Sequence, residues 1–375
     1  MIKSIAIYPH HIDEHYELKI KETAELAAQY GFNEVFTTLH LPELSLAQQL
    51  DCLKTICNYA EKNNLSITVD IGGEYINEIL RSKEYSDTVK KLKIAFIRLD
   101  YGFSKKQIND LYNSFNIRGF VVNASIYSED EINEIVSEMK EIDEKLEIRG
   151  CHNFYVRNET GIDETLAMRQ DSYFRKYEIP VCYCIPSYSN PRGPLFSGLC
   201  TLEKHRFISI EEAVADLIIK YQASYVMMAD EWLTEREFKE FSETVEILTR
   251  PLMPVEDIHV RLADTVTDEE RNIVLGQHVF RYDSPDCFLR SQTSRQMAEY
   301  ARRIKPGNTV KRTYGSVTVD NDRYKRYSGE LQVVMTEAEQ DDKVNVVGII
   351  TDREELLKLR RFREKTVYRF VEDDK

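Results

Sequence analysis

The sequence predicts an α/β protein, with an N-terminal (β/α)8 TIM barrel over residues 1–250 and a small β domain over residues 255–375. Eight short apolar runs alternate with amphipathic helical stretches before residue 231, as in such a barrel. Two prolines between Thr249 and Pro254 then interrupt the chain, and the helical period mostly disappears beyond them. No Gly-x-Gly-x-x-Gly follows the first run, which argues against a dinucleotide-binding sheet.

The apolar runs are rich in Val, Ile, Phe and Tyr, and each is of strand length. They cover residues 4–9, 34–39, 66–71, 94–101, 118–125, 146–155, 179–186 and 225–230. Between them, residues 18–30 carry apolar side chains on one helical face, and Gly31 stands where a glycine ends a helix. Ser104, Ser128 and Thr234 each precede a helical pattern, and Ser128 with Glu131 matches a capping box.

The C-terminal domain has a different pattern. We expect strands over residues 310–319, 330–335 and 344–350, one helix over 294–303 and a short helix over 354–358.

Charge and composition restrict the function. The chain has 50 Lys and Arg against 64 Asp and Glu, a net charge of −14, so its overall field repels nucleic acids and anionic membranes. We expect no signal peptide, no membrane-spanning helix and a cytoplasmic protein. Seven cysteines are an odd count and poor material for a disulfide framework. Cys182 and Cys184 lie in an apolar run, which favours buried thiols over a metal site.

Polar residues gather at the ends of the predicted strands, where such barrels keep their chemistry. Carboxylates and amides bind sugar hydroxyls, and tyrosines offer flat apolar faces. The strand-end residues are Tyr8, His10, His11, His40, Asp70, Arg98, Asp100, Tyr101, Asn123, Ser125, His152, Asn153, Tyr155, Tyr188, Asn190, Arg192, Asp230 and Glu231.

Two carboxylates that face each other across a barrel mouth are what glycoside cleavage requires. We expect Asp100 and Asp230 to supply the acid and the base or nucleophile, with Asp70 as a substitute for either. This chemistry needs no metal and no other cofactor. The spacing alone leaves open a metal site built from His10, His40 and Asp70.

Two further features predict an anionic small ligand. The loop over residues 189–206 is long and rich in Pro and Gly, which favours a substrate-covering loop, and its Arg192 suits a phosphate or carboxylate. Between residues 287 and 330, ten cations stand against four anions. Without a nucleic-acid motif, that stretch favours a small phosphorylated or carboxylated ligand over DNA or RNA.

Motifs along nearly the whole chain resemble the MupG-like family of 6-phospho-N-acetylmuramidases, formerly an uncharacterised "outer surface protein" family. The chain departs from the family's pattern after Asp70, at Cys200 and around Asp230, although the aspartates are kept. The motifs cover residues 98–104, 123–125, 151–155, 160–161, 192–195, 198–199, 201–206, 315–321, 324–330 and 344–348.

The resemblance implies a barrel followed by a cyclophilin-like β-barrel that contributes to substrate binding. It also implies hydrolysis of the β-1,4 bond of MurNAc-6-phosphate–GlcNAc in bacterial peptidoglycan recycling. We expect substrate contacts from Tyr8, Arg98, Asn123, His152, Asn153, Tyr155, Arg192, Glu203, His205, Arg290, Asn321, Tyr324 and Arg326.

Three alternatives remain at this stage. They are hydrolysis of another phospho-glycoside, a phosphosugar isomerase or lyase, and a non-catalytic phosphosugar-binding protein. No predicted strand ends in lysine, which disfavours Schiff-base chemistry. The oligomeric state is left open.

Overall fold

The computed structural model describes residues 1–100, 103–296 and 304–373, and the chain divides into two compact units, Met1–Val245 and Glu246–Lys375. In the first unit eight parallel strands close into a barrel in sequence order, which confirms the predicted (β/α)8 fold. The strands are β1 Ile2–Ala6, β2 Glu34–Thr38, β3 Ser66–Ile71, β4 Ile94–Leu99, β5 Gly119–Asn123, β6 Glu147–Cys151, β7 Val181–Ile185 and β8 Tyr225–Met228.

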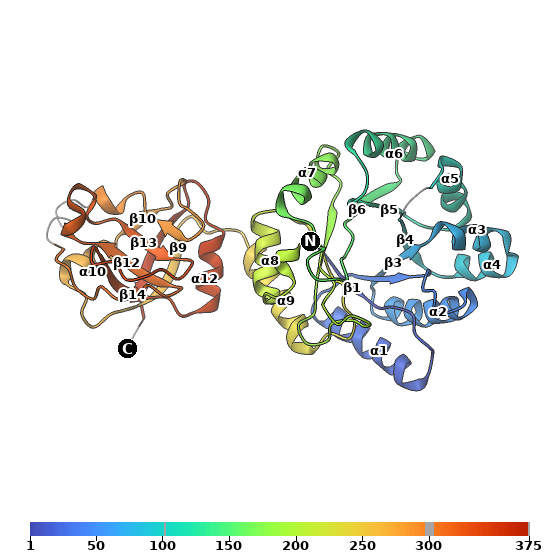
Figure 1. Ribbon diagram of the computed structural model, residues 1–375, viewed down its shortest axis with the longest axis horizontal. Helices are drawn as coiled ribbons and strands as arrows, with labels where there is room; N and C mark the ends of the chain where they lie inside the picture. The colour runs from blue at the N-terminus through green and yellow to red at the C-terminus, as the bar shows by residue number, and fades with distance from the viewer. Residues whose placement is uncertain (101–102, 297–303, 374–375) are drawn as a thin grey trace. The chain divides into compact units, whose positions relative to one another are not determined.

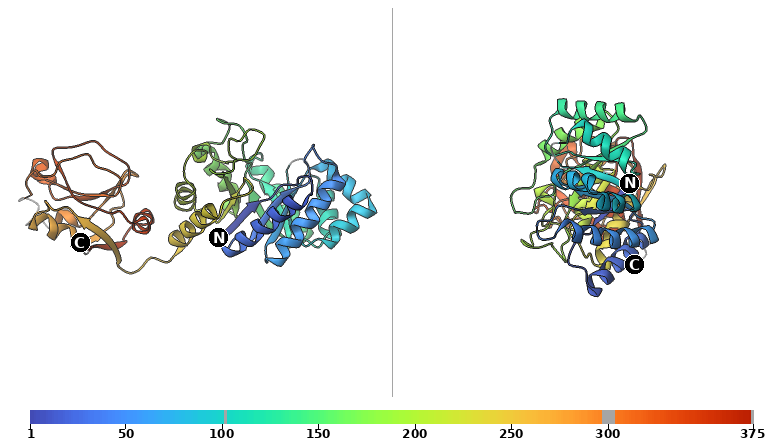
Figure 2. Two further views of the ribbon diagram at one scale, coloured as in Figure 1. Left: turned by 90° about the horizontal axis from the view of Figure 1, so that it is seen from below. Right: turned by 90° about the vertical axis from the view of Figure 1, so that its right-hand side faces the viewer.

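Helices surround the barrel (Figure 1). In both views of Figure 2 the neighbouring helices α1 to α4 lie on its outside. The helices are α1 Glu14–Gln29, α2 Leu46–Lys62, α3 Gly73–Arg81, α4 Lys83–Lys91, α5 Lys105–Ser114, α6 Glu129–Ile142, α7 Glu164–Arg175, α8 Ile210–Ile219 and α9 Glu235–Thr249.

Local sequence signals set the helix ends. Ser104 and Ser128 form capping boxes at the starts of α5 and α6. Both helix starts were predicted, and the capping box was predicted for Ser128. Gly31 follows the end of α1 with a φ of +68°, a conformation that side chains other than glycine rarely adopt.

Alternate residues of each strand point into the barrel. Most of these inward-facing side chains are apolar. Cys182 and Cys184 are buried free thiols in this interior, as predicted. At the N-terminal ends of the strands the fully buried Glu34 accepts hydrogen bonds from Arg149, at 2.7 Å, and from the hydroxyls of Thr68 and Tyr225. The barrel is therefore closed at this end by a buried ion pair.

The second unit is built on a seven-stranded sheet in the order β10-β15-β9-β14-β12-β13-β11, antiparallel except for the β15–β9 pair. Val317, Val319, Leu331 and Val333 point from β12 and β13 into its core. The elements are β9 Glu256–Leu262, α10 Asp268–Val274, β10 Gln277–Val279, β11 Phe288–Arg290, β12 Ser316–Asp320, β13 Leu331–Val334, β14 Val344–Ile349, α12 Arg353–Arg360 and β15 Val367–Glu372.

The predictions for this unit were partly right. The strand expected from residue 310 begins at Ser316, because Gly315 has a φ of +82° and interrupts the extended chain before it. A short 3-10 helix covers Ser294–Gln296, and the rest of the helix expected over 294–303 lies outside the described residues. The cyclophilin-like identity of the sheet stays a prediction.

Candidate active site

A cavity of about 170 Å³ lies at the C-terminal ends of β3, β4 and β6. This is the end of the barrel where such folds place their reacting groups. It brings together five of the residues expected from the sequence, Asp70, Arg98, Asp100, His152 and Asn153. The other lining residues are Phe36, His40, Cys151, Phe154 and Met227.

Arg98 is the centre of the cavity's polar wall. Its Nη1 donates to Asp70 Oδ1 at 3.0 Å and to Asp100 Oδ1 at 3.1 Å. The side chain of Asp100 is 49% exposed, whereas those of Asp70 and Arg98 are buried. One arginine therefore holds two carboxylates, of which only Asp100 is widely open to solvent.

The pKa of Asp70 is shifted upward. Burial raises the pKa of this carboxyl above its ordinary value, although the nearby Arg98 and His40 act in the opposite direction. His40 Nδ1 lies 3.5 Å from Asp70 Oδ2. Asp70 is therefore suited to donate a proton.

Two side-chain amides form hydrogen bonds with this group of charged residues. Asn123 donates from Nδ2 to Asp100 Oδ1 and to Asn153 Oδ1, both at 2.9 Å. Arg98 Nη2 also donates to Asn153 Oδ1, at 2.7 Å. The Oδ1 atom of Asn153 is thus held by two donors.

Asp230 lies elsewhere, in contacts with the loop after β7. It is fully buried, and its two oxygens accept the backbone N–H groups of Ser187, Arg192 and Leu199 at 2.8–3.2 Å. In this loop Gly198 has a φ of +76°, and a Cβ there would approach Pro186 to 2.7 Å. Asp230 therefore anchors the loop that the sequence predicted to cover the substrate.

Arg192 rests on the ring of Tyr8, with its guanidinium carbon 3.7 Å from the ring centroid. Tyr8 is buried and its hydroxyl donates to the carbonyl of Ala229. Arg192 Nε is 3.9 Å from Glu231 Oε1, which also lies 2.8 Å from His10 Nε2. The buried Tyr8 ring thus stacks against the guanidinium of Arg192 and is not itself accessible to a ligand.

Three other residues that were expected to contact the substrate form hydrogen bonds within the protein. Glu203 accepts the N–H groups of Glu159 and Gly161 and pairs with Arg206, which lowers the pKa of Glu203 to about 2. His205 is buried, with Nε2 2.8 Å from Asp216 Oδ2. Tyr155 is half-buried, and its carbonyl accepts from Arg206.

Of the residues expected in the second unit, Arg290 donates from Nε to Glu330 Oε1 at 2.5 Å. Asn321 is fully buried and donates to Asn345 Oδ1 at 2.9 Å. The Tyr324 hydroxyl donates to Asp341 at 3.2 Å, and Arg326 donates to the hydroxyl of the neighbouring tyrosine at 2.7 Å.

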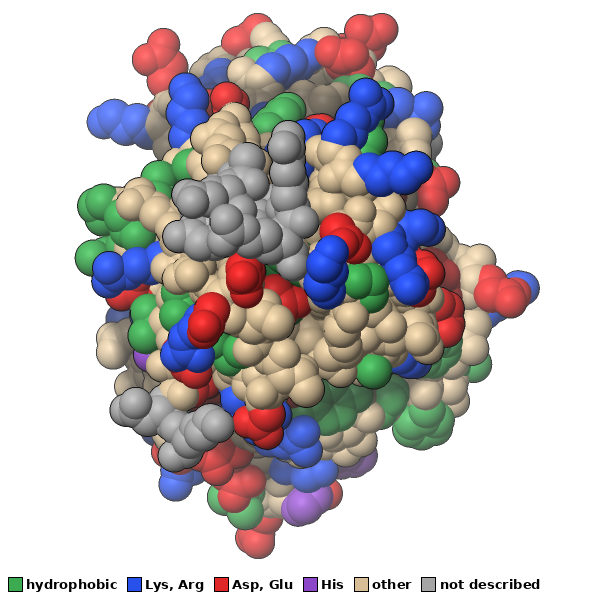
Figure 3. All heavy atoms as spheres, turned by 90° about the vertical axis from the view of Figure 1, so that its left-hand side faces the viewer, with side chains coloured by type: hydrophobic (Ala, Val, Ile, Leu, Met, Phe, Trp, Pro, Cys, Tyr) green, Lys and Arg blue, Asp and Glu red, His purple; other side chains and the backbone are tan. Residues whose placement is uncertain are grey.

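Two cations of the basic stretch pair with acids that lie outside residues 287–330. Lys311 pairs with Glu337 at 2.8 Å, and Arg323 pairs with Asp342 at 2.6 Å. Figure 3 shows basic and acidic side chains side by side on one face of this unit. The excess of cations is therefore smaller in space than along the chain.

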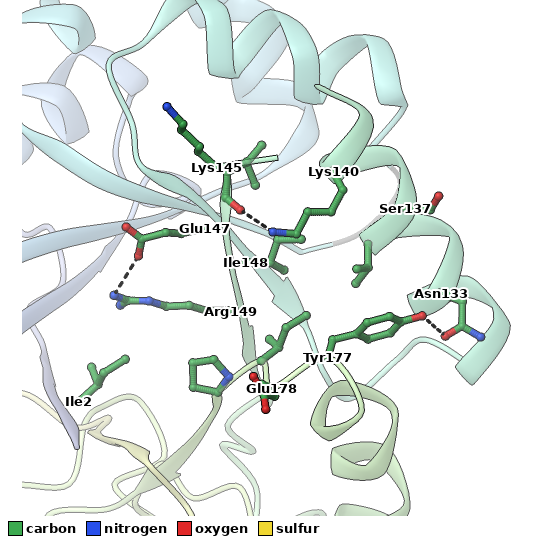
Figure 4. Close-up of a pocket in the computed structure, with 14 residues that line it drawn as sticks. Ile2, Asn133, Ser137, Lys140, Lys145, Glu147, Ile148, Arg149, Tyr177 and Glu178 are labelled. Carbon is green, nitrogen blue, oxygen red and sulfur yellow. Dashed lines mark hydrogen bonds and ion pairs between the residues drawn. The ribbon is translucent and has the colours of Figure 1, made fainter. Parts of the chain in front are cut away.

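A larger pocket, about 770 Å³, lies at the opposite end of the barrel (Figure 4). Residues of α6 and the start of β6 line it, together with Tyr177 and Pro180. That end of a (β/α)8 barrel serves stability rather than catalysis, so size alone does not make it the active site.

Among the described residues, no three His, Cys, Asp or Glu side chains converge in a way that could hold a metal ion. His10 instead contacts Glu231, while His40 lies beside Asp70. In the same ranges no helix is long and apolar enough to cross a membrane.

Family models described as the N-terminal and C-terminal domains of 6-phospho-N-acetylmuramidase match residues 4–243 and 257–371. An uncharacterised B. cereus protein of known structure is similar at 26% identity and a TM-score of 0.66, over 99% of each chain. A conserved Enterococcus faecalis protein of unknown function is similar at 26% identity and a TM-score of 0.62, over 100% of this chain and 97% of that one. No curated protein matches.

Proposed function

The chain belongs to the 6-phospho-N-acetylmuramidase family of glycosidases, and from this premise we propose its substrate and mechanism. We propose that it hydrolyses the β-1,4 bond of MurNAc-6-phosphate–GlcNAc, N-acetylmuramic acid 6-phosphate linked to N-acetylglucosamine. The reaction would belong to peptidoglycan recycling in the bacterial cytoplasm.

The observation that carries the mechanism is the sharing of Arg98 Nη1 by Asp70 and Asp100. The two carboxylate oxygens on that nitrogen are at most about 6 Å apart, since each lies close to 3 Å from it. Retaining glycosidases hold their carboxyl groups about 5–5.5 Å apart and inverting ones about 6.5–9.5 Å apart. We propose a retaining mechanism because this upper limit lies below the separation of carboxyl groups in inverting enzymes.

In this mechanism Asp70 protonates the leaving oxygen and Asp100 attacks the anomeric carbon, after which water releases the sugar. Asp100 is the carboxylate open to the cavity, and Asp70 is the one whose pKa burial raises. We propose Asp70 in place of Asp230 because a reacting carboxylate must touch the substrate, and Asp230 is fully buried against backbone N–H groups.

Arg192 is the cation we assign to the 6-phosphate or the lactyl carboxylate. Its stacking on Tyr8 fixes the plane of the guanidinium, and a planar guanidinium forms two parallel hydrogen bonds with a phosphate. Asn153 and Asn123 are assigned to sugar hydroxyls and the acetamido group. Substrate contacts from Arg290, Asn321, Tyr324 and Arg326 stay predictions.

The test is incubation of the purified protein with MurNAc-6-phosphate–GlcNAc and separation of the products. Release of the two monosaccharides, with the β configuration kept in the first-formed product, would support the proposal. Asp70→Asn and Asp100→Asn should each lose activity, whereas Asp87→Asn, at an exposed position of α4, should not. A substrate that stays intact with the wild-type protein would contradict the proposal.

Dependence on the phosphate is tested with the unphosphorylated disaccharide. Arg192 is partly buried, and a hydrogen bond between charged groups contributes more than one between neutral groups, so loss of the phosphate should lower kcat/KM. Equal values for the two disaccharides would show that Arg192 serves another purpose.

A further inference from the structure

His152 was expected to touch the substrate, but the structure places it in a buried chain of hydrogen bonds. Its side chain is 0% exposed. His152 Nε2 lies 3.0 Å from Asp171 Oδ1 on α7, and His152 Nδ1 lies 3.1 Å from Ser125 Oγ. Asp171 is itself buried, and its other oxygen accepts the Tyr183 hydroxyl at 2.5 Å.

The hydrogen-bond partners of the His152 ring determine which of its two nitrogens carries the proton. A carboxylate only accepts hydrogen bonds, so the proton is on Nε2 of His152, which donates to Asp171 Oδ1. In the neutral ring Nδ1 then accepts from the hydroxyl of Ser125. The oxygen of that hydroxyl keeps its lone pairs for another donor, which is the backbone N–H of Asn153 at 3.0 Å.

Ser125 connects this chain of hydrogen bonds to Asn153, which lines the cavity, and to Asn123. Besides the N–H of Asn153, which its hydroxyl accepts, its own N–H donates to Asn123 Oδ1 at 2.9 Å. That contact leaves Asn123 Nδ2 to donate to Asp100 and to Asn153 Oδ1. Ser125 therefore holds the backbone of Asn153 and the side-chain amide of Asn123, and Asn123 in turn holds Oδ1 of Asn153.

One hydrogen-bond donor at the cavity is the side-chain Nδ2 group of Asn153. Asn153 lines the cavity, and its Oδ1 is occupied by Arg98 and Asn123. Its Nδ2 has no hydrogen-bond partner among the described residues. An amide donor at a fixed position suits a carbonyl oxygen of the substrate, and the acetamido and lactyl groups of an N-acetylmuramyl sugar both carry one.

We propose that Asp171, His152 and Ser125 form a positioning relay that holds Asn153 with its Nδ2 directed at a substrate carbonyl. The inference rests on the proposed function, because it assumes that the cavity at Asp70 and Asp100 binds the sugar. His152 belongs to the cavity lining, but its side chain is 0% exposed, so we assign the three residues no substrate contact of their own and let them act through Asn153.

The experiment is a double-mutant cycle on Asp171 and Asn153, measured as kcat/KM on MurNAc-6-phosphate–GlcNAc. Asp171→Asn should lower kcat/KM about tenfold or more in the wild-type background, as loss of an outer hydrogen-bond partner does at metal sites. In the Asn153→Ala background it should change kcat/KM by less than about twofold, since residues that act through one another are not additive. The same factor in both backgrounds would overturn the relay.

The matched control is Asp216→Asn. Asp216 holds the buried His205 as Asp171 holds His152, and His205 is not connected to Asn153 by any hydrogen bond between described residues. This variant should keep wild-type kcat/KM. If Asp171→Asn does not fold, Ser125→Ala takes its place in the cycle, because it removes the hydroxyl contacts and keeps the backbone contact to Asn123.

A second readout separates failure of the relay from failure of the proposed function. Nitrogen-15 NMR of the wild-type protein should show the proton of His152 on Nε2, and Ser125→Ala should shift the side-chain amide signal of Asn153. These signals need no substrate. If the wild-type protein leaves the disaccharide intact but both NMR results are as expected, the proposed substrate is wrong and the relay stands. A proton on Nδ1 alone would overturn the relay.

Discussion

The two ends of the barrel each hold an arginine paired with a buried carboxylate, but only one pair is open. At the N-terminal ends of the strands Arg149 pairs with Glu34, which is 0% exposed and also accepts from two hydroxyls. At the C-terminal ends Arg98 pairs with Asp70 and with Asp100, whose side chain is 49% exposed in a cavity. The same chemical pair thus closes the barrel at one end and forms a candidate active site at the other.

The difference has a physical cause. Arg149 stacks on Phe96 at 3.7 Å and pairs with the fully buried Glu34, so its charge is already used within the protein although it lines the larger pocket. Arg98 instead divides its hydrogen bonds between two acids and Asn153, and one of those acids keeps solvent access. We therefore expect substitutions at the closed end to change stability and those at the open end to change turnover.

The largest effect is expected at Asp100. Asp100→Asn should lower kcat/KM by about 10²–10⁴-fold, the usual loss when a reacting acid or base is removed. Its side chain is half exposed, so the melting temperature should change little. Steady-state kinetics and thermal unfolding check both parts, and near-normal turnover in a folded variant would remove Asp100 from the mechanism.

At the closed end Glu34→Ala should lower the free energy of unfolding by about 3–5 kcal/mol, because it leaves the guanidinium of Arg149 buried without its partner. The folded fraction should keep wild-type kcat/KM. The control is Glu147→Ala, which removes an exposed partner 3.9 Å from the same arginine and should cost less than about 1 kcal/mol. Equal losses in urea unfolding would show that burial is not what distinguishes the two acids.

Two cations, one at each end, give the next comparison. Arg192→Ala should raise KM for the phosphorylated disaccharide by about 10–100-fold, since a hydrogen bond to a charged group contributes about 1.5–3 kcal/mol. Lys145→Ala, in the pocket at the closed end, should leave KM unchanged. An increase in KM for Lys145→Ala would place a ligand in the larger pocket.

The smallest effect concerns the pH dependence of the open end. Asp70 must be protonated to act as an acid, so kcat/KM should fall as the pH rises through its pKa, which burial raises. His40 lowers the pKa of Asp70, and His40→Ala should therefore move this basic limb to higher pH. The pH profile of kcat/KM measures the shift. If His40→Ala moves the basic limb to lower pH, a group other than Asp70 controls that limb.

The sequence by itself determined the barrel, because strand and helix periods and the capping residues are local properties of the chain. The starts of α5 and α6 and the end of α1 follow directly from Ser104, Ser128 and Gly31. In the second unit the local signals were weaker. The β9 and β15 strands were not predicted, although they lie side by side in its sheet.

Only the tertiary structure distinguished the strand-end acids, which look alike in the sequence. Backbone N–H groups of a loop more than 30 residues earlier in the chain cover Asp230, whereas Arg98 leaves Asp100 open. The same holds for the basic stretch over residues 287–330, where Lys311 and Arg323 pair with Glu337 and Asp342 from outside it. Burial, pairing and the pKa of an acid depend on neighbours that are distant in the chain, so no local pattern carries them.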